Sequence, residues 1–160
     1  MPDDDDSPKV AIIYGSPSDA GVMGQAGAML ERFGVPYSEI SISAHRAPRA
    51  LADWMAELEP RGIEVVIAGA GMSAALPGVV AAHTTLPVIG VPIRGGALDG
   101  LDALLAISQM PPGVPVASVG LDNAKNAAVL AVQILAVADT DLRAKLWKFK
   151  DDFEQAAAPR

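Results

Sequence analysis

Five segments, each about as long as a β-strand, recur along the chain and are separated by longer segments of mixed polarity. Four of them are almost continuously apolar, at residues 9–14, 63–68, 87–92 and 114–119, whereas residues 37–43 alternate. Continuous apolar runs of this length are typical of parallel strands covered on both faces. The pattern therefore predicts five strands, most of them buried.

The mixed segments carry helix signals. Asp19 is a candidate N-cap for a helix that stops at Gly34, and Pro48 opens a second helix to about residue 58. Further helices are expected after residue 78, over 101–110 and over 124–138. Because strands alternate with helices through short loops, the predicted fold class is α/β: a single-domain, doubly wound, three-layer parallel sheet of flavodoxin or Rossmann type with an extra C-terminal helix.

The two ends of the chain differ from this repeating pattern. Residues 1–8 are expected to form a disordered acidic tail, and residues 9–138 the α/β domain. Residues 139–160 form a further helix, with Asp141 as its candidate cap and one apolar stripe, made of Leu142, Leu146, Phe149 and Phe153. This stripe must be buried on its own domain or on a neighbouring subunit, and we expect the second.

Small residues also favour assembly. Gly21, Gly24 and Gly27 recur at every third position of the first helix, which indicates a face where another backbone comes close. Together with the terminal stripe and the Ala-rich helix over 124–138, they predict a homo-oligomer.

Composition limits the classes of function. The 160 residues are 51% hydrophobic but only 4% aromatic, so Ala, Val, Leu and Ile must build the core. Twelve Lys and Arg against nineteen Asp and Glu give a net charge of -7, which argues against a nucleic-acid partner. The absence of cysteine excludes disulfides and thiolate metal sites. Because neither a signal peptide nor a membrane-spanning stretch is present, we expect a soluble, cytoplasmic protein without a membrane partner.

The segment over residues 40–49 is the strongest candidate for chemistry. Ser43-Ala44-His45-Arg46 follows the second strand, and ligands of open α/β sheets bind beyond the carboxyl ends of strands. His45 can carry a proton at neutral pH, and the Arg46 guanidinium suits a phosphate or carboxylate. The alternative is a strand-end loop with a histidine that is satisfied structurally.

The loop after the first strand, Gly15-Ser16-Pro17-Ser18-Asp19, is a candidate anion cradle. Backbone N–H groups at a helix start and the hydroxyls of Ser16 and Ser18 can bind phosphate, and Asp19 can accept from a ribose hydroxyl. The loop lacks the lysine of a P-loop and the spacing of a dinucleotide fingerprint, so a mononucleotide fits better than a large cofactor. A turn capped by Ser and Asp is the alternative.

Small residues also dominate residues 69–78. They let the backbone approach a flat ligand, and Ser73 adds a hydroxyl, although tight strand–helix packing explains the same pattern. We expect His83 at the surface or an interface, and Asp99 and Asp102 are either helix caps or site carboxylates. No serine-nucleophile elbow or metal-ligand set appears, which leaves acid–base chemistry by His45 without metal or redox cofactor.

Several loops together resemble one family. GSPSD at 15–19, SAHRAP at 43–48, AGAG and LPG within 68–78, PVIGVP at 87–92 and LLAISQMPPGVPVA at 104–117 are similar to the PurE family. Its members are N5-carboxyaminoimidazole ribonucleotide mutases and the related aminoimidazole ribonucleotide carboxylases of purine synthesis. The resemblance runs in order over about residues 10–142, and the GSPSD and SAHR pair is its most specific part.

The resemblance implies roles for individual residues. The ribose-phosphate end of a ribonucleotide would be bound by Gly15, Ser16, Ser18, Asp19 and Arg46, with Ser43, Ala44 and His45 as a second wall. The imidazole and its carboxylate would lie against Gly69, Ala70, Gly71, Ser73 and Leu76. His45 would be the proton shuttle while CO2 moves from the exocyclic nitrogen to ring carbon C4. The family needs no cofactor and is usually octameric, its last helix reaching a neighbour.

One stretch departs from the mutase pattern. Bacterial mutases commonly read GGAAHLPG where this chain reads GMSAALPG, so Ala75 replaces a second family histidine. The carboxylase branch typically has serine and alanine at positions 73 and 75, but it often has lysine in place of Arg46 and usually arginine in place of Met72. The resemblance therefore favours the mutase. A carboxylase that uses CO2 directly, and a divergent paralogue that acts on another heterocycle or only binds a nucleotide, remain alternatives.

Overall fold

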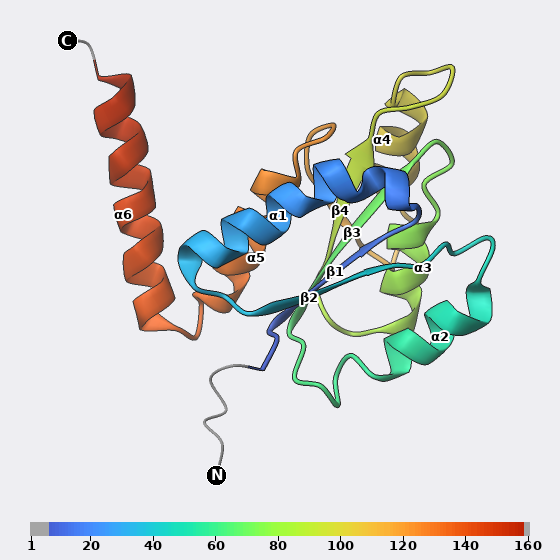
Figure 1. Cartoon of the computed structure of the whole chain (residues 1–160), viewed down its shortest axis with the longest axis horizontal. Helices are drawn as coiled ribbons and strands as arrows, with labels where there is room; N and C mark the ends of the chain where they lie inside the picture. Colours follow the sequence, from blue (N-terminus) through green and yellow to red (C-terminus); the bar gives the residue numbers. More distant parts are fainter. Residues whose placement is uncertain (1–6, 159–160) are drawn as a thin grey trace.

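The computed structural model describes residues 7–158, so the predicted tail over residues 1–8 lies almost wholly outside the described residues. Its centre is a five-stranded parallel sheet in the order β2-β1-β3-β4-β5 (Figure 1). The strands are β1 (Val10–Tyr14), β2 (Tyr37–Ser41), β3 (Val65–Gly71), β4 (Val88–Ile93) and β5 (Ala117–Ser118). The predicted α/β class is confirmed.

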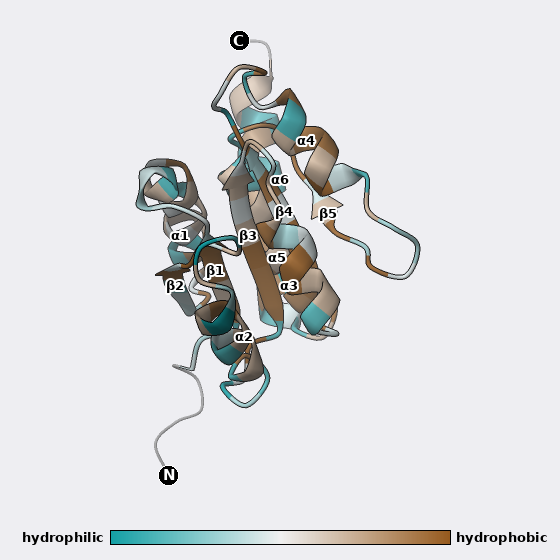
Figure 2. Ribbon diagram, turned by 90° about the vertical axis from the view of Figure 1, so that its right-hand side faces the viewer, coloured by the Kyte–Doolittle hydropathy of each residue, from teal (hydrophilic) through white to brown (hydrophobic). Residues whose placement is uncertain are grey.

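Helices cover both faces of the sheet. A short 3-10 turn, η2 (Pro17–Asp19), leads into α1 (Ala20–Phe33), and the other helices are α2 (Pro48–Ala56), α3 (Leu76–His83), α4 (Leu101–Ser108), α5 (Ala124–Leu135) and α6 (Thr140–Ala157). Successive residues of β1 enter different cores: Val10 and Ile12 pack with α1 and α5, whereas Ala11 and Ile13 pack with α2, α3 and α4. Figure 2 shows the apolar strands enclosed between these helix layers.

The third strand is longer than predicted. It runs to Gly71, because Gly69, Ala70 and Gly71 pair in register with Val91, Pro92 and Ile93 of β4. Residues 69–71 are thus strand rather than turn, and α3 already begins at Leu76. The fifth strand is shorter than predicted, since only Ala117 and Ser118 pair with β4.

One of the two expected caps stands where it was predicted and the other does not. Asp19 occupies the N-cap position of α1, although its side chain makes no cap hydrogen bond there, and Ser16 accepts from the Ser18 N–H at the start of η2. At α6 the cap is Asp139, whose Oδ1 lies 2.9 Å from the N–H nitrogens of Asp141 and Leu142. An N-cap must stand before the first helical residue, and Asp141 is already inside the helix. The predicted stop at Gly34 is confirmed, with φ of 72°.

The glycines of α1 do not meet another backbone among the residues that the structure describes. Gly21 and Gly24 are exposed with open space around them, and Gly27 faces the ring of Tyr37. The predicted close backbone approach is therefore wrong within residues 7–158, where the Tyr37 side chain fills the space beside Gly27.

The apolar stripe of α6 is divided. Leu142 and Leu146 are buried in the core that α1 and α5 share, and Lys145 Nζ donates to the carbonyl of Phe33 at 2.9 Å. Phe149 packs edge-on against Phe33, whereas Phe153 is 62% exposed. Figure 1 shows α6 outside the two helix layers. None of the helices between residues 7 and 158 combines the length and apolar character that a membrane crossing needs.

Candidate active site

A cavity of about 510 Å³ lies beyond the carboxyl ends of β1, β2, β3 and β4. Its volume suits a small-molecule ligand. Its lining comes from the four loops that follow these strands: Gly15, Ser16, Ser18 and Asp19; Ser43, Ala44, His45 and Arg46; Ala70 to Leu76; and Arg94, Gly95 and Gly96. The structure thus brings twelve of the thirteen predicted site residues to one cavity, all except Gly69.

Gly69 lies in the core instead. The Met23 side chain packs where a Cβ of Gly69 would stand, and the strand carries the residue one position short of the cavity. Its carbonyl accepts a hydrogen bond from the N–H of Gly15 at 3.3 Å. Gly69 therefore contacts the candidate site through Gly15, by holding the first loop against β3.

The first loop arranges its polar groups toward the cavity. Ser18 Oγ lies 2.9 Å from Ser16 Oγ and 3.5 Å from Asp19 Oδ1, and the N–H of Asp19 donates to the carbonyl of Ser16 at 2.9 Å. Pro17 fixes the first residue of η2 in a helical φ. Two hydroxyls and one carboxylate are therefore held together on a single turn.

Burial changes the acidity of this region. It raises the pKa of the Asp19 carboxyl above its ordinary value, and hydrogen bonds from the Ser16 backbone and the Ser18 side chain partly offset the rise. Burial also raises the pKa of Tyr14, the last residue of β1, and the carboxylates of Glu39 and Asp19 add to that rise. Tyr14 is therefore a neutral phenol at neutral pH.

The second loop is tied to the first by Arg46. Its Nη2 donates to the carbonyl of Gly15 at 3.2 Å, and its backbone N–H donates to Ser43 Oγ at 3.3 Å. A guanidinium has five N–H donors, so this contact leaves others for an anion in the cavity. His45 is exposed on the same loop and lines the same cavity. A base and a permanent cation thus stand beside the hydroxyl-bearing turn.

The third loop is a strained turn between β3 and α3. Met72 and Ala74 have φ of 52° and 38°, a left-handed conformation that is uncommon for residues other than glycine. The N–H of Ala74 donates to the carbonyl of Gly71 at 3.0 Å and closes the turn. The backbone and the short side chains of Ser73, Ala74 and Ala75 therefore form much of this wall, together with Met72 and Leu76.

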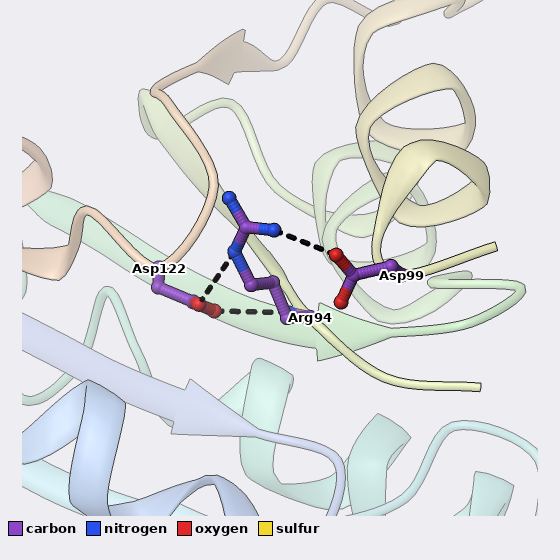
Figure 3. A network of polar contacts seen from close by, with 3 residues as sticks. All are labelled: Arg94, Asp99 and Asp122. Atoms are coloured by element: carbon purple, nitrogen blue, oxygen red, sulfur yellow. Dashed lines mark hydrogen bonds and ion pairs between the residues drawn. The ribbon is translucent and has the colours of Figure 1, made fainter. Parts of the chain in front are cut away.

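Sequence reasoning missed six lining residues: Met72, Ala74, Ala75, Arg94, Gly95 and Gly96. Arg94 directly follows β4, so the carboxyl-end rule that singled out His45 was a signal that could have found it. Arg94 forms ion pairs with Asp99 and with Asp122 (Figure 3).

The remaining candidates lie outside the cavity. Asp99 is a partner of Arg94, and Asp102 Oδ1 lies 3.0 Å from the N–H nitrogen of Ala103 in the first turn of α4. His83 is exposed, with Nδ1 2.9 Å from the carbonyl oxygen of Val79. The predicted surface position of His83 is confirmed.

Residues 9–156 match the family model described as AIR carboxylase. The chain belongs to the AIR carboxylase family. A relative from Pyrococcus abyssi, named N5-carboxyaminoimidazole ribonucleotide mutase, is 55% identical over 148 residues, which are 92% of this chain and 85% of the relative. The resemblance to the PurE family is thereby confirmed.

Two further comparisons show how much of this AIR carboxylase family member its relatives match. A chloroplastic protein of Vigna aconitifolia, named phosphoribosylaminoimidazole carboxylase, is 48% identical over 92% of this chain but only 26% of its own length. The crystal structure of Treponema denticola PurE superposes with a TM-score of 0.86 at 29% identity and covers 93% of both chains. The family fold therefore accounts for nearly the whole chain.

Proposed function

We propose that this chain is an N5-carboxyaminoimidazole ribonucleotide mutase, which moves a carboxyl group from the exocyclic nitrogen of its substrate to ring carbon C4. One observation carries the proposal: His45 and Arg46 line the same cavity as Ser16, Ser18 and Asp19. Relatives that are 50–55% identical and bear the mutase name support it. The reaction takes place in purine synthesis.

Different site residues bind different parts of the substrate. Arg46 and the first loop bind the phosphate, because a guanidinium fork and a turn that carries two hydroxyls both suit a phosphate. The Asp19 carboxylate accepts from a ribose hydroxyl. The small residues over 70–76 lie against the imidazole ring, since their backbone leaves room for it.

The chemical step needs one proton carrier. When the C–N bond of the carbamate breaks, CO2 leaves and the bonding electrons return to nitrogen, which takes a proton from His45. Carbon C4 then attacks CO2 to form the C–C bond, and the C4 proton passes to His45. The imidazole ends in the protonation state in which it began, so one histidine suffices as acid and base.

The alternative function is a carboxylase that uses CO2 directly. Ser73 and Ala75 support it, because both line the cavity and the resemblance associates this pair with the carboxylases. Purified protein incubated with N5-carboxyaminoimidazole ribonucleotide should form the C4 carboxylate without added bicarbonate. A parallel reaction contains aminoimidazole ribonucleotide with excess CO2 and bicarbonate. Turnover in the second reaction alone would replace the mutase with the carboxylase.

We further infer that the exposed side of α6 packs on a neighbouring subunit of a homo-oligomer, an octamer as in the family. Large apolar side chains support this: Trp147 and Phe153 of α6 are 64% and 62% exposed, and Leu98, Leu101 and Leu105, in α4 and the loop before it, are exposed as well. Their exposure in a single chain is unfavourable, and a subunit interface would bury them.

Phe153→Glu should therefore lower the mass of the assembly in solution, because a buried charge without a partner opposes association. Deleting α6 is a poorer test, since Leu142 and Leu146 belong to the chain's own core. Gln155→Glu, at an exposed position of the same helix, is the matched control. Light scattering after size exclusion measures the mass, and an unchanged mass for Phe153→Glu argues against this interface.

A further inference from the structure

Arg94 is a charged residue of the cavity that the proposed chemistry does not use. It follows the last residue of β4, and together with Gly95 and Gly96 it lines the cavity. Its backbone N–H donates to Asp122 Oδ1 at 2.9 Å, its Nε lies 3.4 Å from Asp122 Oδ2, and its Nη1 lies 2.8 Å from Asp99 Oδ2 (Figure 3). Arg94 thus joins the end of β4 to the loops that precede α4 and α5.

The charges of this group argue against a role as an anion binder. One guanidinium and two carboxylates sum to a formal charge of -1, so the cluster as a whole does not attract the phosphate or carboxylate of a substrate. Asp122 is also fixed from the other side, because its N–H donates to the carbonyl of Pro92 at 2.8 Å. The arrangement is that of a clamp on the loop that begins at Arg94.

Backbone strain is concentrated around this clamp. Between residues 7 and 158, the non-glycine residues with positive φ are Met72, Ala74, Asp99 and Asp122. The first two line the cavity, and the last two are the carboxylates on Arg94. Such conformations persist only where surrounding contacts enforce them, and they gather at ligand sites.

Gly96 connects the two strained pairs. A Cβ on Gly96 would lie 3.1 Å from Met72 Cγ, so the loop after β4 packs directly against the turn after β3. Movement of residues 94–96 would therefore release Met72, and with it the turn that carries Ala74.

We propose that Arg94 is a positioning residue for the mutase: through Asp99 and Asp122 it holds residues 94–96, and through Gly96 the strained turn over 72–74, in the shape that fits the substrate ring. The inference depends on the proposed function for its catalytic part. The clamp itself does not depend on that function.

The kinetic test is a double-mutant cycle. Arg94→Gln should lower kcat/KM by about 10- to 100-fold, because displacement of a site wall by about 1 Å can cost that much. The melting temperature should change by no more than about 4 °C, since exposed ion pairs contribute little to stability. Asp99→Asn should also lower kcat/KM. The double variant should have a kcat/KM no lower than that of Arg94→Gln, because both substitutions remove the same Arg94–Asp99 ion pair.

The direction in which Asp99→Asn changes KM shows whether Arg94 positions the loop or binds the substrate directly. If Arg94 contacted the substrate anion, removing the Asp99 charge would free the guanidinium and lower KM below the wild-type value. A lower KM, or a kcat/KM for Arg94→Gln within twofold of wild type, overturns the proposal. Glu64→Gln is the control, because it breaks a comparable exposed pair with Lys9, 3.1 Å long, at the amino ends of β1 and β3, the opposite end of the strands from the cavity.

Amide hydrogen exchange of the full-length protein tests the clamp without any assay of activity. Exchange over residues 72–74, 94–100 and 119–123 should be faster in Arg94→Gln than in wild type and in Glu64→Gln. Equal exchange in all three proteins overturns the clamp. If wild type fails to turn over the mutase substrate but Arg94→Gln still loosens these segments, the proposed function fails and the clamp stands.

Discussion

His45→Asn should lower the mutase turnover number by about 10²–10⁴-fold, the range that a single acid–base group contributes, while the nucleotide still binds. Asparagine keeps much of the size and hydrogen-bonding capacity of histidine, but it cannot carry a proton at neutral pH. The mechanism uses His45 twice, once to protonate the leaving nitrogen and once to accept the C4 proton. Both steps are therefore lost together.

The chain provides its own control for this variant. His83, the other histidine, is exposed on α3 with Nδ1 2.9 Å from the carbonyl oxygen of Val79, outside the cavity lining. His83→Asn should leave turnover unchanged. Single-turnover kinetics of both variants measure the chemical step, and calorimetric titration with aminoimidazole ribonucleotide measures binding. A rate for His45→Asn equal to wild type removes His45 from the mechanism and strengthens the reading of the chain as a nucleotide-binding paralogue.

The layers of the fold could be predicted from the sequence because strands that are buried on both faces are apolar at successive positions. The strand β1 is apolar at every position, since Val10 and Ile12 face one core and Ala11 and Ile13 the other. The end of β3 lacks this apolar pattern. Gly69, Ala70 and Gly71 look like a turn by composition, but they pair with β4, and only the tertiary register decides this.

The candidate site was predictable to the extent that each part is local. His45 and Arg46 are adjacent in the chain and follow a recognisable strand, so the carboxyl-end rule was sufficient to find them. Arg94 obeys the same rule, and its partner Asp99 was already a candidate site carboxylate, but the contact with Asp122 gave no signal because Asp122 lies 28 residues further along the chain. Sequence spacing does not encode contacts between loops that follow different strands, such as the contact between Gly96 and Met72.

Arg46→Gln should raise KM for the mutase substrate by about 10- to 100-fold, because a hydrogen bond to a charged group contributes roughly 1.5–3 kcal/mol. Turnover at saturation should fall much less than in His45→Asn, since the phosphate lies remote from the reacting atoms and its binding is shared by ground state and transition state. The control is Arg49→Gln, at an exposed position in the first turn of α2. Steady-state kinetics of both variants provide the comparison.

The contact of Arg46 with Gly15 raises a second explanation, because the substitution also removes the 3.2 Å hydrogen bond that ties the first two loops together. A substrate without its phosphate separates the two effects. If Arg46 acts on the phosphate, wild type and Arg46→Gln should process the dephosphorylated riboside equally poorly, because the group that distinguishes them is gone. If the variant remains worse than wild type on the riboside by the same factor, Arg46 acts by holding the Gly15 loop and the phosphate is bound elsewhere in the cavity.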